Sequence, residues 1–170
     1  GFCPFCEGNE SQTPPEVLAF REKSRERDAQ GWWVRVVPNK YPAIRMEGAL
    51  KRLGEGMYDK MTGVGAHEVV IEGPDHQLDM ADMSVRQIEE IFWAYRQRMI
   101  ELQSDFRFRY VIIFKNQGAA AGATLEHAHS QIIALPIVPK RVQEEMDGAL
   151  DYYKYKERCV FCDMIRQELR

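Results

Sequence analysis

Residues 126–131, which read "EHAHSQ", lead directly into the apolar run "IIALPIV". The apolar run predicts a buried β-strand, and residues two apart on a strand face the same side of a sheet. We therefore expect His127, His129 and Gln131 to form one polar row at the start of that strand. The chain contains 4 histidines, and the placement of two of them here suggests a functional site. The competing interpretation is a pair of ordinary strand histidines that face water.

The remaining sequence predicts a mixture of strands and helices. Ser84 and Gln87 form an S-x-x-Q capping box, and apolar residues recur at helical spacing after it, which predicts a helix over 85–103. Strands are expected at 32–38, at 65–72, at 109–116 and from near His127 onward, with a second helix over 139–158. We expect 20–30 to be a charged surface segment and the glycine-punctuated residues 47–63 to be a loop. This order favours an α+β sheet over a doubly wound one.

Composition and charge narrow the class of protein. At 170 residues and 19.8 kDa the chain suits one domain with a sizeable core. A net charge of -3 gives no reason to expect a nucleic-acid partner. No apolar run approaches the roughly 18 residues of a membrane span, and no leader segment opens the chain. We expect a cytoplasmic protein that binds neither nucleic acid nor membrane.

The cysteines form two C-x-x-C pairs, Cys3/Cys6 and Cys159/Cys162. In a chain without a signal peptide, such pairs favour metal binding or redox chemistry over disulfides. The first pair can supply two thiolates to a tetrahedral zinc, and two histidine nitrogens would complete the site. His127 and a histidine in or near the 65–76 strand are the natural partners, and both His67 and His76 lie there. This arrangement would leave His129 free for chemistry.

The polar row follows a loop of very small residues, "GAAAG" at 118–122. Such a loop lets the backbone approach a ligand closely, and consecutive N–H groups can cradle a phosphate. An imidazole with an ordinary pKa of about 6.5 is a good nucleophile near neutral pH. Attack on phosphorus would form a phosphorus–nitrogen intermediate and split one displacement into two. The row and the loop together indicate phosphoryl or nucleotidyl chemistry.

Several segments together resemble a known family. These are "CPFCEGNE", "VVPNKYPA", "GPDH", "FKNQGAAAGATLEHAHSQ" and "CVFCD". In order and spacing the chain is similar to the galactose-1-phosphate uridylyltransferases, a branch of the histidine-triad superfamily. The resemblance implies a histidine-triad-like antiparallel sheet flanked by long helices. It also implies a double displacement, in which a nucleotide sugar gives its nucleoside monophosphate to His129 and a hexose 1-phosphate then takes it.

The resemblance also implies roles for individual residues. The structural zinc ligands would be Cys3, Cys6, His76 and His127, which leaves His67 as an ordinary strand histidine. His129 and Gln131 would be the catalytic residues, with the Gln131 amide holding a phosphoryl oxygen. Contacts to the substrate and its phosphates would come from Pro4, Phe5, Asn39, Asn116, Gly122, Ala123, Thr124 and Gln131. Ser130 faces away from the row and receives no role.

The family is built from two similar halves, and this resemblance sets the expected domains. Residues 1–157 would be the N-terminal half, which carries the nucleotidyl-histidine site, and 158–170 the start of a truncated second repeat. Cys159 and Cys162 would belong to a second zinc site that is incomplete in this chain, so we expect them to be unliganded or disordered. The full-length protein is expected to be a homodimer.

The transferred nucleotide is the open question. Lys40-Tyr41 stands where uridylyltransferases carry an acidic residue and Phe, so a ribose contact made by a carboxylate is missing. We favour transfer of UMP between UDP-glucose and galactose 1-phosphate. The alternatives are an adenylyltransferase or phosphorylase acting on ADP-glucose by the same chemistry, a histidine-triad-type nucleotide hydrolase, and a zinc-stabilised, non-catalytic nucleotide-binding module.

Overall fold

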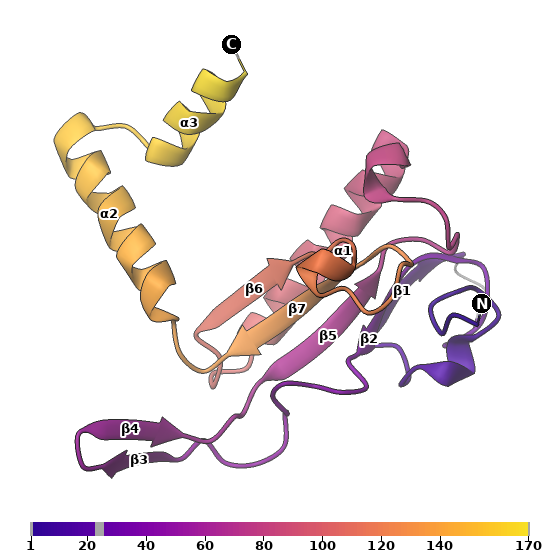
Figure 1. Ribbon diagram of the computed structural model, residues 1–170, viewed down its shortest axis with the longest axis horizontal. Coiled ribbons are helices and arrows are strands. Elements are labelled where there is room, and N and C mark those ends of the chain that lie inside the picture. The colour runs from indigo at the N-terminus through magenta and orange to yellow at the C-terminus, as the bar shows by residue number, and fades with distance from the viewer. Residues whose placement is uncertain (1, 23–25, 170) are drawn as a thin grey trace. The chain divides into compact units, whose positions relative to one another are not determined.

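The computed structural model describes residues 2–22 and 26–169 of the chain (Figure 1). The chain divides into two compact units, Gly1–Pro136 and Ile137–Arg170. The first unit contains a five-stranded sheet with the strand order β1-β2-β5-β7-β6, in which all neighbouring strands are antiparallel. Its strands are β1 Leu18–Arg21, β2 Trp32–Pro38, β5 Ala66–Ile71, β6 Tyr110–Phe114 and β7 His129–Leu135. The α+β class expected from the sequence is confirmed.

Helix α1, Val85–Gln103, covers one face of this sheet (Figure 1). It forms at the predicted residues because Ser84 caps it, accepting a hydrogen bond from the Gln87 N–H at 3.2 Å. The Gln87 side chain does not complete the capping box. It donates instead to the backbone carbonyls of Trp33 and Glu72, at 2.6 Å each, and so ties the start of the helix to the sheet.

The two faces of the sheet bury different partners. Alternation along the strands turns Val36, Val70 and Ile132 toward α1, where they pack in one core. On the opposite face Val69 and Ile71 pack with Cys3, Phe5 and Trp32. The N-terminal segment therefore covers the face that carries the alternate residues of β5 and β7.

Buried charges hold this N-terminal segment on the sheet. The Arg35 side chain, 1% exposed, donates to Glu16 at 2.9 Å and to Asp28 at 2.7 Å. Burial alone would raise the pKa of Glu16, but hydrogen bonds from Arg21, from the Asp28 backbone and from Arg35 outweigh it, so the pKa is lowered. The ionised cluster anchors the chain that follows the first cysteine pair.

Two of the predicted local structures were wrong. Residues 47–63 contain a hairpin, β3 Arg52–Glu55 and β4 Tyr58–Met61, whose turn includes Gly56 at φ 63°. Nearly all of its side chains are exposed, so it lacks the apolar alternation that marks a half-buried strand. Within the predicted surface segment 20–30, Phe20 and Arg21 belong to β1, while residues 23–25 lie outside the described part.

Strand β7 begins at His129, two residues later than expected, because His127 precedes the paired part of the strand.

The second unit holds α2, Lys140–Lys156, and α3, Val160–Glu168. Of the last cysteine pair, Cys159 is the N-cap of α3 and Cys162 lies within the helix, and both are exposed. Among the residues that the structure describes, no helix is long and apolar enough to cross a bilayer.

Packing of α1 predicts a large difference between two isoleucines on the same helix. Ile91 is 0% exposed and Ile100 is 53% exposed. We expect Ile91→Ala to lower the free energy of unfolding by about 2–5 kcal/mol, because it leaves a cavity in the core. Ile100→Ala should change it by less than about 0.5 kcal/mol. Urea denaturation followed by circular dichroism measures both, and equal losses would contradict the assigned core.

Candidate metal centre and active site

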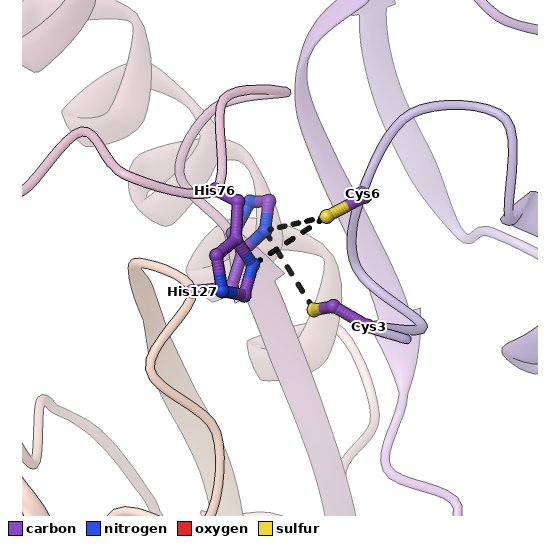
Figure 2. Close-up of side chains that lie close together, drawn as sticks. All are labelled: Cys3, Cys6, His76 and His127. Atoms are coloured by element: carbon purple, nitrogen blue, oxygen red, sulfur yellow. Dashed lines mark hydrogen bonds between the residues drawn. The ribbon is translucent and has the colours of Figure 1, made fainter. Parts of the chain in front are cut away.

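Four side chains from separate parts of the chain meet in one cluster (Figure 2). Cys3 and Cys6 come from the N-terminal segment, His76 from the loop after β5, and His127 from the residues just before β7. Their potential ligand atoms all lie within 4.8 Å of one another. These are the residues that the resemblance implied as zinc ligands, and the structure brings all four together.

The distances suit a tetrahedral ion such as Zn²⁺. His127 Nδ1 lies 3.8 Å from Cys3 Sγ and 3.6 Å from Cys6 Sγ, and His76 Nδ1 lies 3.5 Å from Cys6 Sγ. Tetrahedral zinc bonds of about 2.3 Å to sulfur and about 2.0 Å to nitrogen imply sulfur–nitrogen separations of roughly 3.5 Å. The cluster can therefore hold a metal ion with little rearrangement.

The protonation state of His127 also suits a metal ligand. The ring is 0% exposed, and its Nε2 lies 2.8 Å from the Gly73 carbonyl oxygen. A carbonyl can only accept, so Nε2 carries the proton and Nδ1 keeps the lone pair that a metal needs. Burial is the main cause that lowers the pKa of His127, which favours the neutral ring. Burial and then the neighbouring Cys3 raise the pKa of the Cys6 thiol, a balance that a bound cation would reverse.

His129 begins β7, and its orientation is set by the residue two before it. Its Nδ1 lies 2.7 Å from the backbone carbonyl oxygen of His127, so Nδ1 donates and Nε2 keeps its lone pair. The Phe5 ring packs edge-on against the imidazole, with centroids 5.4 Å apart. The nitrogen that can act as a nucleophile therefore points away from the backbone.

A cavity of about 400 Å³ borders His129 and Gln131. Its volume is typical of small-molecule sites, which span roughly 300–1,000 Å³. Among the described residues that line it, Lys40 is the one charged side chain and none is a carboxylate. The electrostatics therefore suit an anionic ligand. Five of the residues predicted to contact substrate line this cavity: Pro4, Phe5, Asn39, Thr124 and Gln131.

The small-residue loop is a tight turn. Gly118 and Gly122 flank the 3₁₀ turn Ala119–Ala121 at φ 77° and 87°, a conformation that glycine adopts without strain. The N–H groups of Ala121, Gly122 and Ala123 donate to carbonyl oxygens of the loop itself. Asn116, Gly122 and Ala123 lie outside the described lining of the cavity, so their contacts with a phosphate stay predictions.

Sequence reasoning treated His67 as an ordinary strand histidine, but its ring contacts Gln131. His67 Nε2 lies 2.7 Å from Gln131 Oε1, and Asn39 Nδ2 lies 3.2 Å from the same Nε2. In the β5–β7 register Val69 is opposite Gln131, which makes His67 its diagonal neighbour. The sequence holds no signal of this contact, because it depends on how separate strands pair.

A buried polar network lies on the other face of β7. Ser130 Oγ is 2.7 Å from the Tyr95 hydroxyl, which donates to Glu72 at 3.3 Å. Lys115 Nζ donates to Glu72 at 2.6 Å and to the His129 carbonyl at 3.2 Å. Burial raises the pKa of Tyr95 far above its usual range, so the hydroxyl stays a donor. The network, which includes the Ser130 that received no role, fixes the backbone of His129 from behind.

Comparison with known proteins places this geometry in a family. Residues 23–139 match the family described as galactose-1-phosphate uridyl transferase, N-terminal domain. An ADP-glucose phosphorylase from Arabidopsis thaliana is 37% identical over 163 residues, which cover 95% of this chain and 45% of that protein. A galactose-1-phosphate uridylyltransferase from Thermotoga maritima is 33% identical over 133 residues, which cover 76% of this chain and 41% of that protein. The chain belongs to the galactose-1-phosphate uridyl transferase family.

Solved structures agree with this assignment. The crystal structure of an ADP-glucose phosphorylase from Arabidopsis thaliana with bound ADP-glucose superposes with a TM-score of 0.79 at 34% identity, over 95% of this chain and 49% of that one. A histidine triad nucleotide-binding protein from Sulfolobus tokodaii shares the fold, with a TM-score of 0.52 at 16% identity, over 78% of this chain and 68% of that one. The histidine-triad-like fold is confirmed. The chain spans about half the length of its relatives from Arabidopsis thaliana.

We expect one zinc ion per chain at the four-residue cluster. Cys6→Ser should lower the zinc content strongly and the melting temperature with it, because bound metal contributes to folding. The matched control is Cys159→Ser/Cys162→Ser, which alters the exposed pair and should leave the zinc content at the level of the unmodified chain. Elemental analysis by mass spectrometry measures the content, and full occupancy in Cys6→Ser would contradict the site.

Proposed function

We propose that this chain carries the nucleotidyl-accepting site of a transferase that acts on a nucleoside diphosphate sugar. His129 Nε2 attacks the phosphorus next to the nucleoside and forms a phosphorus–nitrogen bond. The bond between that phosphorus and the bridging oxygen breaks, and the sugar 1-phosphate leaves. A phosphate-bearing acceptor then attacks the same phosphorus, and its oxygen replaces His129. The observation that carries the proposal is the hydrogen bond from His129 Nδ1 to the His127 carbonyl, since it leaves Nε2 able to attack.

Gln131 is proposed to hold a phosphoryl oxygen during both displacements. Its side chain lines the cavity beside His129, and an amide N–H can stabilise the charge that develops on that oxygen. An amide is no acid, so it cannot protonate a leaving group as an imidazolium could. This favours transfer to an acceptor over hydrolysis, which is the main argument against a histidine-triad-type hydrolase.

Zinc would be held by the cysteine–histidine cluster, where it would serve structure. The ion would fix the ring and backbone of His127, and the carbonyl of His127 orients the nucleophile. Its role would be positional, because four protein ligands would fill the tetrahedral positions that structural zinc uses. A non-catalytic module with the same metal would not need His129 to line a cavity with its Nε2 unprotonated.

Adenosine is the better candidate for the nucleoside, with ADP-glucose as donor and inorganic phosphate or a sugar phosphate as acceptor. The sequence alone favoured UMP transfer to galactose 1-phosphate. The phosphorylase from Arabidopsis thaliana supports the adenylyl alternative, because its identity of 37% extends over 95% of this chain. Lys40, which lines the cavity, is consistent with a changed ribose contact. Uridylyl transfer is the second candidate, supported by the relative from Thermotoga maritima at 33% identity.

The division into 1–157 and a truncated second repeat at 158–170, with Cys159 and Cys162 in an incomplete second zinc site, is part of the same proposal. It is supported by the repeated C-x-x-C unit and by the roughly half coverage of the relatives. A homodimer of the longer protein is proposed on the resemblance alone.

Intact-protein mass spectrometry after mixing with ADP-glucose or UDP-glucose tests the function. We expect a mass gain of one AMP from ADP-glucose, preserved by quenching at mildly alkaline pH. His129→Ala should abolish the gain, and Gln131→Ala should slow it by roughly 10²–10³-fold. Tyr58→Ala, which changes the exposed hairpin, is the control that should leave it intact.

The other outcomes decide between the candidates. A mass gain of one UMP from UDP-glucose, without a gain from ADP-glucose, would favour uridylyl transfer and leave the proposed mechanism unchanged. Steady release of free nucleotide without acceptor would favour the hydrolase. Absence of any adduct in folded, zinc-loaded chain would contradict the proposed function for this chain.

A further inference from the structure

The sheet register sets three polar side chains in one row across three strands. Pro38 pairs with Glu68, and the Asn39 N–H donates to the His67 carbonyl at 2.8 Å, which continues the β2–β5 ladder by one residue. His67 in turn is the diagonal neighbour of Gln131 on β7. The row therefore runs from Asn39 through His67 to Gln131, next to the nucleophile. His67 is the member whose role is unassigned.

A backbone donor fixes the tautomer of His67. The Ala43 N–H donates to His67 Nδ1 at 3.1 Å. Because a backbone amide cannot accept, Nδ1 must hold a lone pair and the proton of the neutral ring must lie on Nε2. Nε2–H therefore donates to Gln131 Oε1 across the 2.7 Å contact.

A second backbone donor orients Asn39 in the same sense. The Tyr41 N–H donates to Asn39 Oδ1 at 2.8 Å, which turns the Asn39 NH₂ group toward the row. Asn39 Nδ2 lies 3.5 Å from Gln131 Oε1, at the long limit of a hydrogen bond. Its 3.2 Å approach to His67 Nε2 joins two donors, so it adds no bond in this tautomer. Both side chains thus direct N–H groups at the carbonyl oxygen of Gln131.

We propose that His67 is a positioning residue that fixes which end of the Gln131 amide faces the phosphate; the inference rests on the proposed function. With Oε1 engaged by His67, the NH₂ group is the end left to donate into the cavity, and no described residue accepts from it. A flipped amide would set a carbonyl oxygen against an anionic phosphate and NH₂ against the His67 N–H, so both contacts would be repulsive.

The kinetic test compares two substitutions of His67. His67→Gln can place an amide N–H near the original Nε2–H, whereas His67→Leu removes the donor. We expect His67→Leu to slow formation of the nucleotidyl adduct by on the order of 10- to 100-fold, with a smaller change in the Kd for ADP. His67→Gln should restore most of the rate. Melting temperature and zinc content, measured on both variants, show whether the fold is intact.

A double-mutant comparison separates positioning from a general structural role. If His67 acts through Gln131, then His67→Leu should have no further effect on the rate in a Gln131→Ala chain. The proposal would be overturned if the two substitutions together slow adduct formation by the product of their separate effects. It would also be overturned if His67→Leu alone leaves the rate unchanged. A lower melting temperature of His67→Leu without a slower formation of the adduct would also overturn the proposal.

A second measurement needs no reaction. Long-range ¹H–¹⁵N NMR of uniformly ¹⁵N-labelled chain should show His67 protonated at Nε2 and bare at Nδ1, with the signals assigned by their absence in His67→Gln. The side-chain NH₂ resonances of Gln131 should move in His67→Leu. A proton on Nδ1, or unmoved Gln131 resonances, would overturn the positioning role. If the unmodified chain forms no adduct, the proposed function fails, and this measurement decides the role of His67 alone.

Discussion

The antiparallel pairing of β5 with β7 is the constraint on which the rest of the site depends. It sets Val69 opposite Gln131 and Ile71 opposite His129, so that every second residue of both strands faces the N-terminal segment. The remaining residues face α1 and form the larger core. A shift of one residue would exchange the two sets and bury the polar row under the helix. The core that packs against α1 therefore specifies the register, and the register assembles the site.

Much of the site follows from local sequence, because its spacing is itself structural. The H-x-H-x-Q pattern before an apolar run places His129 and Gln131 on one face of a strand, and the structure has them on one cavity wall. Helix α1 was readable from its cap and its apolar spacing. The hairpin β3–β4 was not, since an exposed strand pair has no buried face to pattern. The contact between His67 and Gln131 was also unreadable, since it depends on how two strands far apart in sequence align.

His129, the proposed nucleophile, is supported from both sides of its strand. On the cavity side, the His127 carbonyl accepts from the His129 ring and Phe5 packs against it. On the helix side, Lys115 donates to the His129 carbonyl while it pairs with Glu72, which is 0% exposed. A buried carboxylate needs a cationic partner. Here the Lys115 ammonium group also donates a hydrogen bond to the strand backbone. Groups that look purely structural thus contact both the ring and the backbone of His129.

His127 takes part in two arrangements at once. Its side chain belongs to the candidate metal cluster, and its backbone carbonyl accepts the hydrogen bond from Nδ1 of the His129 ring. If a metal ion binds there, any adjustment of its ligand bond lengths or angles would pass through this one residue to the proposed direction of attack. His127 supplies both contacts, so a bound metal ion and the direction of the proposed nucleophile would be set together. A different ion would then alter the proposed catalytic geometry, although its proposed role involves no contact with the substrate.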